Sequence, residues 1–248
     1  IAGLTGCASS EMLAGLADDK SELIQKIAVV ALRRRADPEV RHFLYSPFKE
    51  VVAEAARAIH DDWSIPKALP ALARSLPKTK WIKHEGLIRR AINANFHLGT
   101  PEAATRVADY AIQVDAPEEL RFNALNALGK WPKPDKLDRV VGRYRPLPHR
   151  NPAIAKNTVS KYLTNLLIDP SQKIQSESMA LARLLKLEIP GEALIAVAKN
   201  ESSIPALRIE ALRARASQKN TNLPTIIASA FESKESSIRI EALKILAK

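Results

Sequence analysis

A nine-residue pattern that returns seven times limits what this chain can fold into. Its clearest copy is residues 207–215, and the copies begin at Ile24, Val51, Leu87, Leu120, Ile174, Leu207 and Ile238. The first place holds a branched aliphatic residue, while alanine predominates at the fifth and eighth places. Places one, five and eight are spaced by four and three residues, so they share one face of an α-helix. Small residues there let a neighbouring helix approach closely, which predicts an all-α stack of helical hairpins.

The spacing of the copies predicts a repeat architecture. Successive copies begin 27, 36, 33, 54, 33 and 31 residues apart. Paired helices at this period indicate an α-solenoid (α-α superhelix) of about seven hairpins. In the longest interval we expect a helix near residues 135–144, a proline-rich loop and one inserted helix near 153–167.

We therefore expect one solenoid over residues 1–248. It would comprise N-terminal repeats (1–144), the loop with its inserted helix (145–170) and C-terminal repeats (171–248). The segment Arg145–Asn151 should be the most mobile internal one, because prolines interrupt the repeat there. Residue 1 is Ile and the last copy ends close to Lys248, so we expect a fragment of a larger protein.

Composition agrees with a helical protein and gives weak information on partners. Hydrophobic residues make up 46% of the chain, aromatic residues only 5%, and there are only eight glycines, which argues against a turn-rich β protein. The net charge of +11 favours anionic partners. No apolar run approaches the ~20 residues that a membrane span needs. The single cysteine, Cys7, excludes an internal disulfide, and Leu4-Thr5-Gly6-Cys7 matches a lipoprotein box without its upstream segment.

The repeat pattern carries a resemblance to a known family. A branched residue followed by Arg-x-Glu-Ala-x-x-Ala, a turn and Pro-x-Ala-Leu-Pro-x-Leu resembles HEAT repeats over nearly the whole chain. Four stretches look like the HEAT segment of large exported bacterial proteins with a sorbosone- or glucose-dehydrogenase-like propeller and a c-type cytochrome domain. These stretches are residues 54–61, 89–103, 128–135 and 143–150.

That resemblance implies a role as a spacer and docking part, with a protein partner or the neighbouring domains bound to it. It also implies a location on the periplasmic or extracellular side of a bacterium, although a cytoplasmic location remains open. The chain departs from the family because it contains no Cys-x-x-Cys-His motif and no propeller. This segment is therefore expected to carry neither quinone nor haem, and we predict no cofactor.

Catalytic and metal motifs are missing from the sequence. The histidines are His42, His60, His84, His97 and His149; none forms His-Glu-x-x-His or lies at a ligand spacing from Cys7. There is no Gly-x-Ser-x-Gly, no phosphate-binding glycine loop and no dinucleotide fingerprint. We therefore predict no catalytic residue and no metal site, and we expect that this segment is not an enzyme.

Basic residues fall into two groups. Arg121, Arg208 and Arg239 occupy the second place of the pattern, where an arginine typically pairs with a carboxylate of the next hairpin. Others lie in turns, where they either follow a phosphate backbone or are simply solvated; these are Arg33, Arg34, Arg35, Lys78, Lys80, Lys83, Arg143, Arg145 and Arg150.

The seventh place should point away from the core into a concave groove, and the third place lies on the same face. The candidate binding surface there consists of Arg57, Arg89, Asn93, Asn126 and Arg213. Arginine and asparagine at these places suit a carboxylate, a phosphate or backbone amides. A hydrated groove with local hydrogen bonds is the alternative.

Two functions follow from these observations. The first is a non-catalytic protein-interaction scaffold or spacer within a larger redox protein. The second is a basic helical-repeat nucleic-acid-binding module that resembles helical DNA glycosylases. Such enzymes need an aromatic cleft, whereas Trp63, Trp81 and Trp131 lie at turns or helix ends. Nucleic-acid binding is therefore expected to be weak, non-specific and sensitive to salt.

Overall fold

The protein is all-helical. The computed structural model describes residues 6–77, 83–218 and 223–247, and within these ranges it contains no β-strand. Their one β-type pairing is an isolated bridge between Leu137 and Tyr144. The chain divides into two compact units, residues 1–155 and 156–248, which are described separately.

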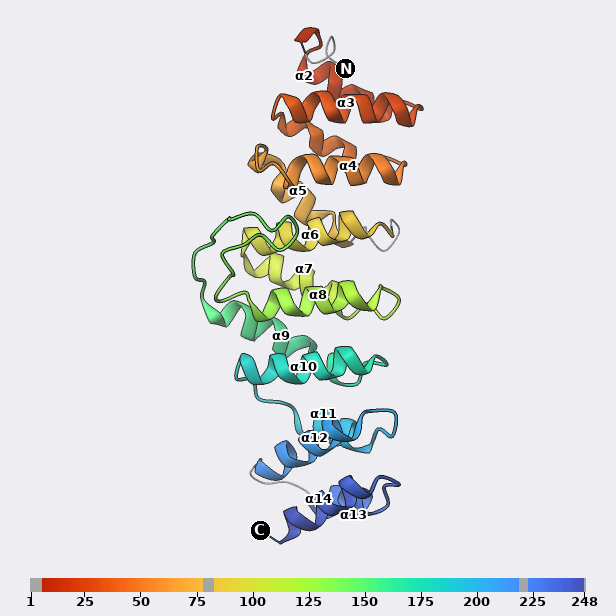
Figure 1. Cartoon of the computed structure of the whole chain (residues 1–248), viewed down its shortest axis with the longest axis vertical. Coiled ribbons are helices and arrows are strands. Elements are labelled where there is room, and N and C mark those ends of the chain that lie inside the picture. Colours follow the sequence, from red (N-terminus) through yellow and green to blue (C-terminus); the bar gives the residue numbers. More distant parts are fainter. Residues whose placement is uncertain (1–5, 78–82, 219–222, 248) are drawn as a thin grey trace. The chain divides into compact units, whose positions relative to one another are not determined.

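In the first unit, short helices alternate with longer helices that carry the nine-residue pattern (Figure 1). The pattern-bearing helices are α3 (Glu22–Arg34), α4 (Lys49–His60), α6 (Glu85–Leu98) and α8 (Glu118–Gly129). Their partners are α2 (Ser10–Gly15) with the 3-10 turn Leu16–Asp18, the 3-10 helix Pro38–Tyr45, α5 (Leu69–Arg74) preceded by the 3-10 turn Pro66–Ala68, and α7 (Pro101–Ala111).

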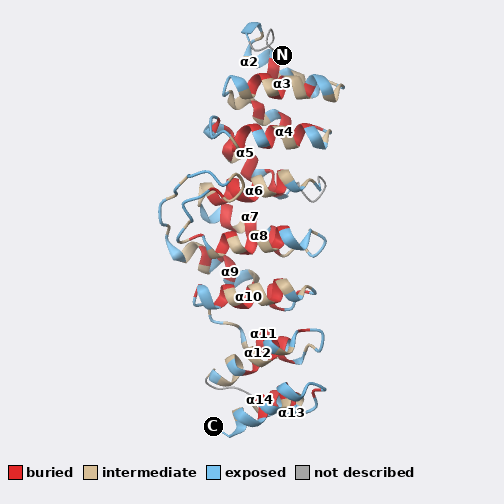
Figure 2. Ribbon diagram, viewed as in Figure 1, coloured by how far each residue is buried: buried red, intermediate tan, exposed pale blue. Residues whose placement is uncertain are grey.

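The fifth place of the pattern explains how these helices pack. Ala28, Ala55, Ala91 and Ala124 are all 0% exposed. Helix α3 contacts α4, α4 contacts α6, and α6 contacts α8, so the four helices lie side by side with their buried faces turned inward (Figure 2). Alanine allows the close approach because it has no side chain beyond Cβ. The pattern therefore predicted these helices correctly.

Capping side chains begin several helices. The Ser9 side chain accepts a hydrogen bond from the Met12 N–H at 3.1 Å, and Thr100 accepts one from Ala103 at 3.2 Å. Asp37 accepts one from the Glu39 N–H at 3.0 Å. Pro38 and Pro101 follow two of these caps, at a place where the missing N–H costs little.

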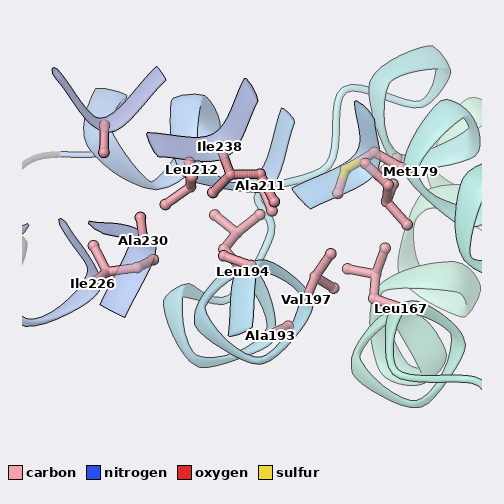
Figure 3. Close-up of a cluster of buried hydrophobic side chains, with 14 of the residues drawn as sticks. Leu167, Met179, Ala193, Leu194, Val197, Ala211, Leu212, Ile226, Ala230 and Ile238 are labelled. Atoms are coloured by element: carbon pink, nitrogen blue, oxygen red, sulfur yellow. The ribbon is translucent and has the colours of Figure 1, made fainter. Parts of the chain in front are cut away.

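The second unit holds the other three copies of the pattern. They lie on α10 (Gln172–Leu184), α12 (Pro205–Ser217) and α14 (Ser236–Leu246), while their partners are α9 (Pro152–Leu167), α11 (Gly191–Lys199) and α13 (Leu223–Phe231). Leu167, Met179, Leu194 and Ile238 belong to one buried cluster (Figure 3). Helix α9 begins in the last residues of the first unit and packs through Leu167 into this core.

In three pattern-bearing helices, an arginine at the second place binds a backbone carbonyl of the preceding chain. Arg121 and Arg208 donate to the carbonyl groups of Ala111 and Ala198 at 2.8 and 2.9 Å, and Arg239 donates to Ser233 at 2.7 Å. For Arg208 and Arg239 the partner is a backbone carbonyl rather than the expected carboxylate.

Glutamine at the same place makes an equivalent connection twice. Gln25 donates to the Asp19 carbonyl at 2.7 Å and accepts from the Ser46 hydroxyl at 2.6 Å. Gln175 repeats this with Asp169 at 2.6 Å and Ser203 at 2.8 Å. The second place is therefore structural in both units.

The helix predicted near residues 135–144 does not form. Asp138 instead accepts hydrogen bonds from the backbone N–H groups of Val140 and Val141, and its own N–H donates to the Arg143 carbonyl at 2.7 Å. Gly142 follows with φ +67°, which a helix does not use. The stretch between α8 and α9, residues 130–151, is thus a loop without a helix; that α9 is an inserted helix stays a prediction.

Candidate functional site

Loop 130–151 follows α8 and folds back beside α6 (Figure 1). Two of its side chains join a buried polar cluster with residues of α4 and α6. His60 is the last residue of α4, Asn93 and His97 lie on α6, and Asp138 and Arg145 come from the loop. The side chains of His60, His97 and Asp138 are 0%, 3% and 0% exposed. The cluster lies within the first unit and joins three separate parts of it.

Asp138 is the centre of this cluster. Its Oδ2 accepts from Asn93 Nδ2 at 2.9 Å and from His97 Nε2 at 3.0 Å, and it lies 3.4 Å from Arg145 Nη1. Its Oδ1 accepts the N–H groups of Val140 and Val141 at 2.9 Å each. Burial alone would raise the pKa of Asp138, but hydrogen bonds from His97 and from these two N–H groups lower the pKa well below its usual value. The side chain is therefore a fully bonded carboxylate.

His60 is oriented by its neighbour in the chain. Its Nδ1 lies 3.0 Å from Asp61 Oδ1, and its Nε2 lies 2.8 Å from Asn93 Nδ2. Arg90 holds Asp61 in a two-bond pair at 2.8 and 2.7 Å. Burial would raise the pKa of Asp61, yet the bonds from His60 and Arg90 lower it well below the usual range. Asp61 is thus an acceptor, so the His60 proton lies on Nδ1.

Arg145 fastens the loop to the end of α4. Its guanidinium donates to the carbonyl groups of His60, at 3.1 Å, and of Asp61. The same group lies 5.1 Å above the Trp63 ring, which in turn packs on the His97 ring with a centroid distance of 4.5 Å. Trp63 has φ +59°, a strained backbone conformation for a bulky residue. These two stacking contacts hold it there.

Arg150 fastens the other end of the loop. It lies over the rings of Phe96 and Trp131, at 4.8 and 5.2 Å. Burial lowers its pKa to about 10. It also passes so close to Gly99 that a Cβ there would lie 2.6 Å from its Nε. That segment 145–151 is the most mobile stays a prediction; its two arginines, Arg145 and Arg150, are packed against aromatic rings.

The structure separates the residues of the candidate groove. Arg57 and Arg89 remain on the surface, with side chains 56% and 38% exposed. Asn93 is only 2% exposed and belongs to the cluster, so it does not line an open groove. Asn126 accepts a hydrogen bond from Arg139 of loop 130–151 at 2.8 Å. The loop covers the places that the pattern alone would leave open.

Several other basic residues are also engaged within the protein. Arg213, in the second unit, forms a two-bond pair with Glu241 at 2.7 Å for each bond. Arg33 joins Glu54 and Asp62 at 3.2 and 2.7 Å. Lys78 and Lys80 lie outside the described residues. Arg213 and Arg33 are thus paired with carboxylates of the chain itself.

Sequence reasoning missed His60, His97 and Asp138 as a group. In the described part of the chain, their ligand atoms form one cluster within 4.8 Å of one another, as a metal ion would require. A partial signal was present: His60 and His97 lie one and two residues beyond the ends of successive copies of the nine-residue pattern. The helices that carry these copies, α4 and α6, contact each other. Asp138 gave no comparable signal, because its position depends on how the loop folds back.

We expect acid to destabilise the fold through Asp61 and Asp138. Their pKa values are lower in the folded state than in the unfolded chain, so the stabilisation is present above about pH 4 and is lost as the pH falls further. Each carboxyl should add about 1.4 kcal/mol per pH unit to the slope of the free energy of unfolding against pH. Urea unfolding at several pH values between 6 and 2.5 measures this slope. Asp138→Asn should make the slope shallower by about one proton; an unchanged slope would contradict the assignment.

Comparison with known proteins leaves the family open. No protein-family model and no curated protein sequence matches the chain. Among solved structures, one similar chain is the crystal structure of an engineered protein from a structural genomics programme. It is 18% identical, with a TM-score of 0.36, and the match covers 96% of this chain and 95% of that one. Within the described residues, no helix has the length and apolar character of a membrane span.

Proposed function

We propose that this chain is a non-catalytic scaffold, an α-solenoid of the HEAT type that serves as the spacer and docking part of a larger redox protein. Its partner would be another protein or a neighbouring domain of the same one. The observation that carries the proposal is the serial contact of α3, α4, α6 and α8 through buried alanines at one place of the pattern. Stacked repeats of this kind form extended binding surfaces.

The bonding within the cluster supports a structural role for the polar residues. Asp138 has hydrogen-bond partners on both oxygens, and Arg145 is bound to two carbonyl groups and an aromatic ring. These contacts attach loop 130–151 to two pattern-bearing helices. A rigidly attached loop beside a repeat stack suits a docking surface, because little order has to be gained when a partner binds.

A nucleic-acid-binding module is the competing function, and the net charge of +11 favours it. Several arginines suited to that role already bind groups of the protein itself. Arg33 pairs with two carboxylates, Arg145 donates to the His60 carbonyl, and Arg150 lies over two aromatic rings. Arg57 and Arg89 are the exposed candidate-groove arginines of the first unit. They provide a direct test.

Titration of labelled duplex DNA at two salt concentrations distinguishes the two functions. For a scaffold we expect weak binding at about 50 mM salt that falls by 10³-fold or more at about 200 mM, because counterion release drives it. The variant Arg57→Ala/Arg89→Ala should lose no more affinity for the duplex than a control variant of equal charge. Arg34→Ala/Arg74→Ala is that control, since both residues are exposed and lie in the last turns of α3 and α5.

Two results would contradict the scaffold. One is tight binding that persists at the higher salt concentration. The other is a loss in the groove variant that clearly exceeds the loss in the matched control. Both together would establish the groove as a nucleic-acid interface.

A further inference from the structure

We propose that His60, His97 and Asp138 form a binding site for a divalent transition-metal ion, with Zn²⁺ as the best match. The ligand atoms are His60 Nε2, His97 Nε2 and Asp138 Oδ2, and they lie within 4.8 Å of one another. The site goes beyond the scaffold role and does not depend on it. Its metal would join the end of α4, the end of α6 and loop 130–151.

The distances between the ligand atoms suit a small ion. Tetrahedral Zn²⁺ with bonds of about 2.0–2.1 Å places neighbouring ligand atoms about 3.3–3.4 Å apart. Asp138 Oδ2 lies 3.0 Å from His97 Nε2 and 3.7 Å from His60 Nε2. The observed distances lie on either side of the ideal value. Shifts of a few tenths of an ångström would therefore bring these pairs to coordination geometry.

His60 has the outer contacts that a metal-binding histidine needs. Such a histidine typically donates its second ring N–H to a carboxylate, which sets the tautomer and the ring orientation. Asp61 Oδ1 takes this role at 3.0 Å from Nδ1, and Arg90 fixes Asp61 through two bonds. The lone pair of Nε2 consequently faces Asp138 and His97. In the present structure the Asn93 amide donates to it.

Asp138 is also held in a fixed orientation, through its oxygen Oδ1. Val140 and Val141 hold Oδ1 through their backbone N–H groups, so Oδ2 can exchange its present partners for a metal without releasing the side chain. Metal entry would replace the Asn93 hydrogen bonds to His60 and Asp138. Asn93 Oδ1 is buried and has no hydrogen-bond partner among the described residues. In the proposed site it would be available to accept a hydrogen bond from a metal-bound water.

The donor set selects the kind of ion. Two imidazoles and one carboxylate suit Zn²⁺ and its transition-metal neighbours, whereas Mg²⁺ and Ca²⁺ prefer oxygen ligands. Arg145 Nη1 lies 3.4 Å from Asp138 Oδ2. Its positive charge weakens purely electrostatic attraction for any cation. Binding must therefore come from coordination by the imidazoles, which further disfavours Mg²⁺ and Ca²⁺.

His97 provides a distinctive signature. At present its Nε2 donates to Asp138, and its buried Nδ1 has no hydrogen-bond partner among the described residues. Coordination through Nε2 requires the opposite tautomer, with the proton on Nδ1. His60 already has its proton on Nδ1 and would keep it. Binding at this site thus predicts a tautomer change at one histidine and none at the other.

The experiment adds ZnCl₂ to chelator-treated full chain. We expect one equivalent to bind, the melting temperature to rise by about 5–10 °C at a free concentration 100-fold above the dissociation constant, and MgCl₂ to have no such effect. His97→Gln should abolish the shift. Cys7→Ser/His42→Gln removes an exposed thiol and an exposed histidine and should retain it.

Nitrogen-15 NMR of the histidine rings provides the second measurement, and it needs only the wild-type chain. Expected are metal-induced changes at Nε2 of His60 and His97, together with the tautomer change at His97. The proposal is overturned by the absence of saturable one-to-one binding, by changes confined to other histidines, or by full binding in a folded His97→Gln variant. If His97→Gln does not fold, the ring spectra alone decide.

Discussion

Replacing Asp138 by alanine is expected to lower the free energy of unfolding by about 3–5 kcal/mol, the cost of removing one partner from a buried charged network. The substitution leaves Asn93, His97 and two backbone N–H groups without their acceptor, in a place that water reaches poorly. It also releases the turn that attaches loop 130–151 to α6. Urea unfolding at pH 7, monitored by circular dichroism, measures the loss.

Asp135→Ala is the matched control for this substitution. Asp135 lies in the same loop, but its side chain is 52% exposed and pairs with Lys130 at 3.2 Å on the surface. Exposed pairs contribute at most about 1 kcal/mol. A loss at Asp138 no larger than that at Asp135 would show that the buried cluster does not hold the loop.

Trp131→Ala should destabilise the first unit by about 3–5 kcal/mol, as expected for a large buried aromatic side chain. Trp131 is 0% exposed and packs edge-on against Phe96, with a centroid distance of 5.5 Å. Its removal leaves a cavity and also takes away one of the two rings that cover the Arg150 guanidinium. Burial lowers the pKa of that guanidinium, so a less sheltered Arg150 should also regain an ordinary pKa.

Thermal and urea unfolding of Trp131→Ala and of Tyr144→Ala test this expectation. Tyr144 belongs to the same loop but is 68% exposed, so its loss should change stability by no more than about 0.5 kcal/mol. Equal effects of the two substitutions would mean that the loop's aromatic contacts are not part of the core. A large effect for Trp131 alone would confirm the packed arrangement.

The helices were predictable because the information that specifies them is local. Residues spaced three and four places apart form one face of a helix, so a short stretch of sequence shows whether that face is apolar. The Ser9, Asp37 and Thr100 caps likewise act within three residues.

Helical periodicity gave a wrong prediction at one place. Leu137, Val140, Val141 and Tyr144 have helical spacing, yet the Asp138 side chain binds the local N–H groups and Gly142 turns the chain.

The candidate site depended on tertiary structure. Asp138 reaches Asn93 and His97 across 45 and 41 residues of sequence, and Arg145 reaches His60 across 85. No periodic pattern relates residues in a loop to residues on two helices, so sequence could place Asn93 and Asn126 on a helix face but not reveal that a loop covers them. The sequence by itself determined the repeated helices and their buried alanines, since those follow from local spacing. Only the folded chain decided which polar residues meet, because a buried carboxylate must find all of its partners in three dimensions.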